Sequence, residues 1–99
     1  MSPKVLEIHP AAVEELIAAT AWYRERSPAA AARFAAEIDR SMEVVIAAPH
    51  RWLAGKGGTR HFVMHHFPFA IVYRETETAI QVLAFAHGHR RPGYWRNRL

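Results

Sequence analysis

The chain has 99 residues, of which 51% are hydrophobic, a formal net charge of +4 and no cysteine. This length supports one hydrophobic core but not two, so we expect a single domain over residues 1–99. The absence of cysteine excludes a disulfide framework and a thiolate metal site. The sequence contains no apolar run of about 18 residues that could span a membrane. Residues 1–4 also lack the apolar segment of a signal peptide, so we expect a soluble, cytoplasmic protein.

The charge is divided unevenly along the chain. Residues 1–49 hold five Lys/Arg and seven Asp/Glu, a formal charge of −2, whereas residues 50–99 hold eight and two, a formal charge of +6. Six of the seven histidines are also in the second half. This asymmetry indicates an anionic partner, either a nucleic acid or an acidic protein segment. A basic surface that only aids solubility is the alternative.

A short strand and a helix are predicted at the N-terminal end. The segment from Val5 to Ile8 is apolar and partly β-branched, which is typical of a strand, and Pro10 is well placed to begin a helix. From Ala11 onward the spacing of the apolar residues becomes helical. The predicted apolar stripe consists of Val13, Leu16, Ile17, Thr20 and Tyr23 or Arg24.

A second helix follows directly. Ser27 is predicted to be its N-cap and Pro28 its first residue. Its apolar stripe is predicted to contain Phe34, Ile38, Met42, Val45 and Ile46. Arg33, Glu37 and Arg40 are at pairing distance and are predicted to face solvent. Both helices are rich in alanine, which favours helix formation and the close approach of two helices in a hairpin.

Three strands are predicted in the second half, after a glycine-rich loop from His50 to Gly58. They cover Arg60 to Met64, Phe67 to Tyr73 and Ile80 to Ala86, with turns between them. The predicted fold is therefore α+β in two layers, with the order β-α-α-β-β-β and a helical hairpin on one face of an antiparallel sheet. The first strand is expected to join the sheet beside the last strand.

The last two strands are apolar on both faces and so need cover on both faces. The helical hairpin covers only one of them. The other face must be closed by the C-terminal tail, a second subunit or a partner protein. The tail, from His87 to Arg98, holds two histidines, four arginines, Tyr94 and Trp95. The arginine guanidinium binds phosphate or carboxylate, whereas the two aromatic rings either stack on a partner or cover the open sheet face.

Several short motifs, in this order and spacing, resemble one family. In the first half they are His9-Pro10-Ala11, Glu14, Glu15, Trp22, Tyr23, Ala32-Arg33-Phe34, Glu37 and Ile38. In the second half they are Pro49, Gly58, Arg60, Phe67-Pro68-Phe69, Ile71, Tyr73 and His87-Gly88-His89-Arg90-Arg91-Pro92-Gly93-Tyr94-Trp95. Over essentially its whole length the chain resembles toxins of the RelE/ParE superfamily from type II toxin–antitoxin systems, the plasmid-stabilisation type.

The resemblance implies a basic, growth-inhibiting toxin that a cognate antitoxin neutralises. Operator DNA would be met only indirectly, through the antitoxin. ParE-like members poison DNA gyrase, whereas RelE-like members are ribosome-dependent mRNA endonucleases that need no metal. A degenerate, non-toxic member that serves only as the partner of its antitoxin is a third alternative. The resemblance implies no cofactor and no membrane partner.

Three strand positions favour the gyrase-directed alternative. Some mRNA-cleaving relatives carry lysines at the positions of His61 and Val63, and an arginine is expected at Ala70. A histidine-based nuclease, as in some other branches of the superfamily, is the other alternative, and it would draw on His61, His65, His66, His87 and His89. For a nuclease, the candidate catalytic residues are His87, Arg90 and Tyr94. The candidate contacts with the target or the antitoxin are Arg60, His61, His89, Arg91, Trp95 and Arg96. No metal site is predicted, and His65-His66 is interpreted as a turn.

Overall fold

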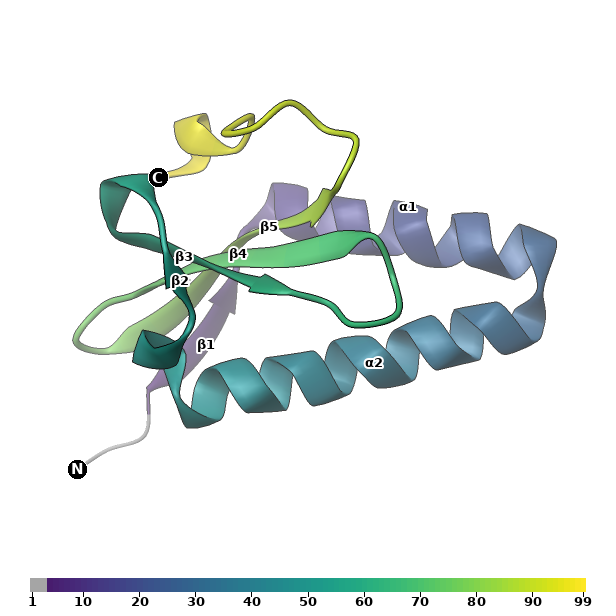
Figure 1. Cartoon of the computed structure of the whole chain (residues 1–99), viewed down its shortest axis with the longest axis horizontal. Helices are drawn as coiled ribbons and strands as arrows, with labels where there is room; N and C mark the ends of the chain where they lie inside the picture. Colours follow the sequence, from purple (N-terminus) through teal and green to yellow (C-terminus); the bar gives the residue numbers. More distant parts are fainter. Residues whose placement is uncertain (1–3) are drawn as a thin grey trace.

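The computed structural model describes residues 4–99 and shows two helices packed on a five-stranded sheet (Figure 1). The strands lie in the order β1-β5-β4-β3-β2. The elements are β1 (Val5–Ile8), α1 (Pro10–Arg26), α2 (Pro28–Ala47), β2 (Leu53–Ala54), β3 (Thr59–Val63), β4 (Phe69–Glu75) and β5 (Ala79–His87). Residues 1–3 lie outside the described residues. They belong to the N-terminal segment in which no signal peptide is predicted.

The α+β architecture, the helical hairpin and the position of β1 beside β5 are confirmed. The antiparallel meander is also confirmed, but the sheet as a whole is mixed, because β1 pairs with β5 in the parallel sense, with Val5 opposite Ala79. A two-residue strand, β2, lies inside the predicted loop and pairs with β3.

A single residue, Ser27, separates the two helices. Its backbone N–H donates to the Tyr23 carbonyl at 2.8 Å and ends α1, while its hydroxyl accepts from the Ala30 N–H at 3.2 Å and begins α2. Pro28 follows as the first helical residue. The predicted N-cap is confirmed, and its two bonds satisfy one carbonyl at the end of α1 and one N–H at the start of α2.

The buried face of α1 differs from the predicted stripe. Val13 and Ile17 are 38% and 63% exposed, although they are large and apolar. The residues that face the core are Ala12, Leu16, Ala19 and Tyr23. Leu16 and Tyr23 of the predicted stripe are thus confirmed, whereas Val13 and Ile17 are replaced by small alanines, whose low hydropathy gave no signal. Because alanine is small, this side of α1 can approach the core closely, and it is therefore the side that is buried.

The stripe on α2 is largely confirmed, but Glu37 is not on the solvent side. Phe34, Ile38 and Val45 are buried, whereas the Glu37 side chain lies in contact with the β3–β4 turn and the residue is only 5% exposed. Its carboxylate accepts from the N–H groups of His65 and His66, both at 2.9 Å, and bonds the His66 ring at 2.6 Å.

Those three bonds also decide the charge state of the carboxylate. Burial alone would raise the pKa of Glu37, but the hydrogen bonds from His66 and His65 outweigh it, and the pKa lies below its ordinary value. The folded state therefore keeps an anion on the inner side of α2. Glu37 fastens the turn between β3 and β4 to the helix.

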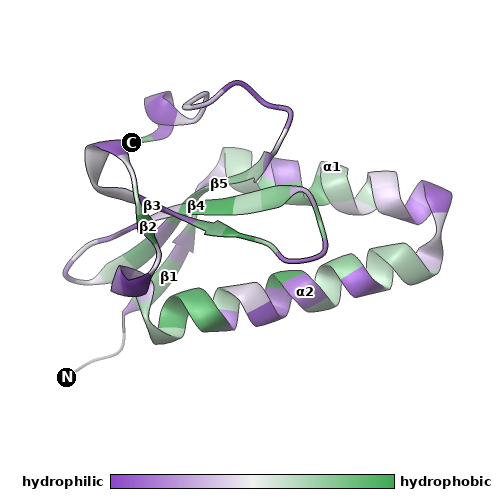
Figure 2. Ribbon diagram, in the orientation of Figure 1, coloured by the Kyte–Doolittle hydropathy of each residue, from purple (hydrophilic) through white to green (hydrophobic). Residues whose placement is uncertain are grey.

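The core fills the space between the helices and one face of the sheet. It contains Ala12, Phe34, Ile38, Val45, Met64, Ile71, Tyr73, Ile80, Val82 and Phe85. The Tyr73 hydroxyl reaches the Pro49 carbonyl at 2.6 Å, so its one polar atom is satisfied. Apolar β4 and β5 run through the middle of the molecule, with a mostly polar tail beyond them (Figure 2).

The opposite face of the sheet is covered by the C-terminal tail, one of the three alternatives considered from the sequence. Trp95 is 5% exposed and packs against Val72, Leu83 and Ala84, with Tyr94 at the margin of the same cluster. The tail lies on the side of the sheet away from α2 (Figure 1). Within the described chain, this second cluster gives β4 and β5 apolar neighbours on both faces.

Candidate functional site at the open edge of β5

The strand β5 is longer than its neighbour β1, which leaves part of its edge without a strand. Pairing between β1 and β5 ends where Ile8 faces Val82. The chain then turns into α1, and the His9 N–H donates to the Val82 carbonyl at 2.8 Å. The segment Leu83–His87 therefore has a strand on its β4 side only.

Two charged side chains occupy the first part of this open edge. Glu15, on α1, accepts a hydrogen bond from the Phe85 N–H at 3.1 Å. Arg98, in the tail, donates to the Leu83 carbonyl at 3.0 Å. A helix and the tail thus take the place of the missing strand, and both satisfy backbone groups that would otherwise be buried without a partner.

The two side chains also bind each other. The Arg98 guanidinium donates to both carboxylate oxygens of Glu15, at 2.9 and 3.1 Å, and the two side chains are 13% and 15% exposed. The Tyr94 hydroxyl donates to Glu15 Oε2 at 2.7 Å. This network joins α1, β5 and the tail through one carboxylate, and the Glu15 contacts raise the pKa of Arg98.

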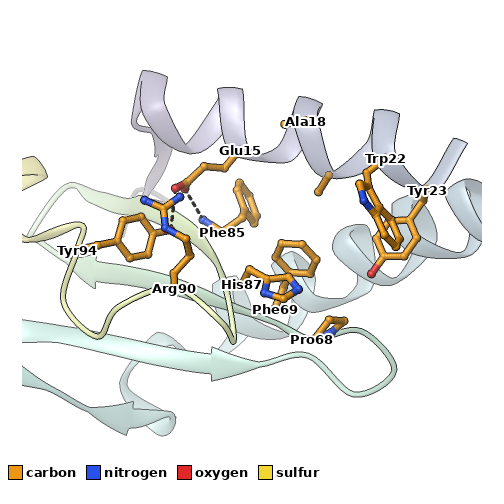
Figure 3. A pocket seen from close by; sticks show the side chains of 11 residues that line it. Glu15, Ala18, Trp22, Tyr23, Pro68, Phe69, Phe85, His87, Arg90 and Tyr94 are labelled. Atoms are coloured by element: carbon orange, nitrogen blue, oxygen red, sulfur yellow. Dashed lines mark hydrogen bonds between the residues drawn. The ribbon is translucent and has the colours of Figure 1, made fainter. Parts of the chain in front are cut away.

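A cavity of about 420 Å³ lies beside this network (Figure 3). One wall is apolar and comes from α1 and the strand ends, and the other is polar and comes from α1, the end of β5 and the tail. The apolar wall consists of Ala18, Ala19, Trp22, Tyr23, Pro68, Phe69 and Phe85. The polar wall consists of Glu15, His87, Arg90 and Tyr94. All three predicted catalytic residues therefore line the same cavity.

Tyr94 is held in its neutral form. Burial, the hydrogen bond to Glu15 and the negative charge of Glu15 together raise the pKa of Tyr94 to about 12. Near neutral pH, the hydroxyl is therefore protonated, and its proton is already used in the hydrogen bond to Glu15. It is poorly suited to transfer a proton to or from a substrate.

His87 is half-buried at the end of β5, with its ring 5.0 Å from the Phe69 ring. The His89 N–H donates to His87 Nδ1 at 3.0 Å. Because Nδ1 accepts this bond, the ring carries its proton on Nε2 in this arrangement. The available ring nitrogen is thus a donor, and the turn after β5 fixes its tautomer.

Arg90 supplies positive charge at the mouth of the cavity. Its guanidinium lies 3.9 Å from the centre of the Tyr94 ring, a cation–π contact. The residue is exposed, and among residues 4–99 no carboxylate forms an ion pair with it. Arg90 is therefore a positioned cation whose hydrogen-bonding groups are available to a partner.

The remaining predicted contact residues divide into exposed and structural groups. His89, Arg91 and Arg96 are exposed around the tail. Arg60 is half-buried on β3 and donates to the Trp52 carbonyl at 2.8 Å, so it bonds a backbone group rather than a carboxylate. Arg91 and Arg96 extend the positive surface that begins at Arg90.

His61 and Trp95 lie together on the tail side of the sheet. Their ring centres are 5.6 Å apart, and burial lowers the pKa of His61. Trp95, which was expected to contact the target or the antitoxin, is buried and covers the sheet. The His61 ring is therefore part of the interface between β3 and the tail.

The structure places the strand positions discussed above on one face and His87 on the other. Phe62 packs with the helix-side core, so alternation puts its neighbours His61 and Val63 on the tail side. Ala70 faces Val63 across the β3–β4 pair and shares that side. His87, opposite Phe69, lies on the helix side of the sheet.

Sequence reasoning missed the structural roles of the half-buried Glu15 and the buried Glu37. Glu15 was noted only as part of the family motif, and Glu37 was expected on the solvent side. The excess of Lys/Arg over Asp/Glu in the second half of the sequence was an available indication that a carboxylate such as Glu15 is needed. The second half holds eight Lys/Arg but only two Asp/Glu, so a buried tail arginine needs a carboxylate from the first half. The particular helix position cannot be derived from that count.

Over residues 4–99, no group of three or more His, Cys, Asp or Glu side chains is arranged to hold a metal ion. No helix in the same range is both long and apolar enough to cross a membrane. His65 and His66 form the predicted turn, and Glu37 binds it.

Comparison with known proteins gives a consistent result. The family model described as the ParE toxin of the type II toxin–antitoxin system parDE matches residues 6–92. Among solved structures, that of the chromosomal ParDE toxin–antitoxin system from P. aeruginosa matches with a TM-score of 0.75. The match is 18% identical in sequence and covers 86% of this chain and 96% of that chain, and at this identity it shows the fold alone. No curated protein matches the chain.

The structural match agrees with the two helices packed on a mixed five-stranded sheet. The matched segment includes β1, both helices, the whole meander and the start of the tail with His87 and Arg90. The chain belongs to the ParE toxin family of type II toxin–antitoxin systems.

Proposed function

We propose that this ParE-family toxin inhibits growth by binding DNA gyrase and that a cognate antitoxin neutralises it. The observation that carries the choice of gyrase over mRNA is that the strand positions where some mRNA-cleaving relatives carry basic residues lie on the opposite face of the sheet from the cavity with His87, Arg90 and Tyr94. His87 and Arg90 line the cavity beside α1, whereas His61, Val63 and Ala70 belong to the tail side of the sheet.

Metal-independent RNA cleavage requires several groups at one phosphate. A base must take the proton of the 2′-OH, an acid must protonate the leaving oxygen, and cations must stabilise the developing charge. Val63 and Ala70 supply neither a proton nor a charge. His61 packs against Trp95, so a base there would be separated from His87 by the sheet. This arrangement supports a toxin that acts by binding rather than by cleavage.

The state of Tyr94 supports the same choice. A hydroxyl with a pKa of about 12 that already donates to Glu15 does not serve as an acid or a base at neutral pH. Arg90 then acts as a cation for recognition. We propose that Arg90, Arg91, Arg96 and His89 contact an acidic surface of the target.

Induction of the chain in cells with separate readouts tests the proposed function. We expect growth arrest with DNA breaks and an SOS response, and stabilised cleavage complexes when the purified protein is added to gyrase and DNA. Rapid loss of mRNA with stalled ribosomes, without gyrase poisoning, would contradict the proposal. The absence of a growth defect would instead favour a non-toxic member that serves only as antitoxin partner.

A pair of histidine substitutions sharpens this test. A histidine-based nuclease should lose at least about a hundredfold in activity when its general base is removed. We expect His87→Gln and His61→Gln to keep most of the toxicity, since neither imidazole has to transfer a proton when gyrase is bound. Circular dichroism of each variant checks that the fold is intact. A complete loss of toxicity in a folded His87→Gln variant would favour the nuclease.

A further inference from the structure

We propose that an exposed apolar patch on β2 and β3, centred on Leu53 and Val63, is part of the surface that binds DNA gyrase. The gyrase surface that it fits is apolar at its centre and acidic at its margin. Gyrase as the partner rests on the proposed function, whereas the patch is a feature of the fold.

Two side chains form the centre of the patch. Leu53 on β2 and Val63 on β3 are 74% and 71% exposed, and no other large apolar side chain among residues 4–99 is more exposed. Leu53 lies opposite His61 in the antiparallel pair of β2 and β3, and Val63 is two residues farther along β3. Cross-strand neighbours and alternate residues of a strand share one face, so both side chains are on the tail side of the sheet. Such diagonal neighbours are roughly 7–8 Å apart, close enough to form one surface.

Neither residue contributes to the hydrophobic core. Trp95 fills a neighbouring part of the same face together with Val72, Leu83 and Ala84, but Leu53 and Val63 belong to neither cluster of buried residues in the described chain. Two adjacent aliphatic side chains in water gain free energy only when a partner covers them. The patch therefore has the properties of a contact surface.

The patch is continuous with the tail. The ring of His61, which shares this face, is 5.6 Å from the Trp95 ring. At the end of the chain, the Leu99 side chain is 45% exposed and lies against Gly57, in the loop between β2 and β3 (Figure 1). A partner that binds the arginines of the tail therefore also contacts the patch.

The charge around the patch favours an acidic partner. Residues 44–74 and residues 78–99 contain no Asp or Glu. Arg51 and Lys56, which precede and follow β2, are exposed and form no ion pair within residues 4–99. An apolar centre with a basic margin is complementary to an apolar surface with an acidic margin. A second copy of this chain would present the same basic margin, so repulsion disfavours it.

The exposed side chains favour a protein over a nucleic acid. Proteins that bind single-stranded nucleic acids stack the bases on accessible aromatic rings. Leucine and valine offer no ring for stacking, and the nearby Trp95 is only 5% exposed. The patch is therefore suited to apolar side chains of a protein.

The test compares two double variants of the full chain in binding to purified gyrase. Leu53→Ser with Val63→Ser removes the patch, and the matched control, Val5→Ser with Ile17→Ser, removes side chains that are 61% and 63% exposed elsewhere. Fluorescence anisotropy of the labelled chain, titrated with gyrase, measures the affinity. We expect the patch variant to bind at least about tenfold more weakly, because it loses two buried aliphatic contacts, and the control to bind like the parent. Urea unfolding checks that both variants are folded.

Salt distinguishes the apolar contact from the contacts of the tail arginines. The patch variant should lose affinity by nearly the same factor at low and at high salt, since an apolar contact is not screened. Arg91→Glu with Arg96→Glu changes charge alone, so its effect on gyrase binding should shrink as salt is added. A loss in the patch variant that disappears at high salt would overturn the apolar contact.

The remaining outcomes separate the patch from the proposed function. Equal gyrase binding by the parent and the patch variant, or an equal loss in the control, would overturn the patch and retain gyrase as the target. A parent chain that does not bind gyrase at all would refute the proposed function, and this proposal with it.

Other occupants of the patch have their own signatures. The patch variant could bind gyrase normally but lose affinity for the cognate antitoxin, for single-stranded RNA or for a second copy of the chain. Each of these results would overturn the proposal and identify that partner as the occupant.

Discussion

Tyr94 shows how one polar atom links pH to the stability of the tail. Its hydroxyl donates to Glu15, and only the protonated form can make this bond. Because its pKa is raised to about 12 from the ordinary 10.0, the folded state holds the proton more tightly than the unfolded state. The resulting stabilisation is complete below pH 10 and is lost as the pH rises toward about 12.

Tyr94→Phe should therefore have two effects. At neutral pH it should lower the free energy of unfolding by about 2 kcal/mol, since it removes a hydrogen bond to a charged carboxylate. Between pH 10 and about 12 the variant should lose less stability than the parent. Urea unfolding followed by tryptophan fluorescence measures both effects.

Tyr23→Phe is the matched control for that experiment. Burial also raises the pKa of Tyr23, but the structure gives its hydroxyl no hydrogen-bond partner among residues 4–99. The control should therefore change little at neutral pH. If the two variants were equally stable at pH 7, the bond between Tyr94 and Glu15 would contribute nothing to the fold.

Glu15 and Glu37 mark the limit of sequence reasoning for single residues. Each lies on a helix among positions that alternate between buried and exposed, and spacing alone assigns a carboxylate to solvent. Their partners, Arg98 and the N–H groups of His65 and His66, come from more than 25 positions away. Contacts of this range depend on the assembled fold, so the candidate site was found only as a set of tail residues without its acidic centre.

At the scale of elements, the C-terminal tail is a structural layer as well as a candidate binding surface. Trp95 packs against Val72, Leu83 and Ala84, and Arg98 bonds the edge of β5. Basic side chains on the same short segment remain exposed. The tail thus holds its arginines in place by burying a tryptophan between them.

Trp95→Ala should destabilise the protein by about 3 kcal/mol or more, because it removes a large buried side chain. Trp22→Ala, at a position that is 51% exposed, should cost less than about 1 kcal/mol. Urea unfolding of the two variants measures the difference. Trp95→Phe keeps part of the ring and should fall between them. A Trp95→Ala variant as stable as Trp22→Ala would show that the tail is not part of the core.

Most elements were predictable from the sequence, and the errors have identifiable causes. Caps and periodicity identified both helices, and continuous apolar runs identified β4 and β5. The strand β2 has only two residues, too few for any periodic pattern. The parallel sense of β1 and β5 depends on contacts between distant residues such as Val5 and Ala79, which no local pattern reveals. On α1 the predicted stripe followed large residues such as Val13 and Ile17, whereas alanine packing decided which side is buried.

At the scale of the whole molecule, the basic surface and the hydrophobic core lie in different regions. The hairpin and the helix-side face of the sheet form an apolar core, and the excess positive charge of residues 50–99 gathers in large part on the tail. The exposed patch of Leu53 and Val63 lies beside the tail, because the His61 ring on the same face contacts Trp95. A partner that binds the arginines of the tail therefore also meets this patch.

This separation predicts that toxicity depends on where the positive charge lies and not on its total amount. Arg91 and Arg96 are exposed and form no ion pair within residues 4–99, so Arg91→Glu with Arg96→Glu should leave the fold intact. It should weaken growth inhibition about tenfold or more, because like charges would then face an acidic target. The matched control, Arg24→Glu with Arg33→Glu, places the same charge change on exposed positions of the hairpin. Viable counts after induction, at equal protein levels, compare the two double variants. If both lose toxicity equally, net charge alone matters and the tail is not the contact surface; if neither does, the arginines of the tail do not take part in recognition.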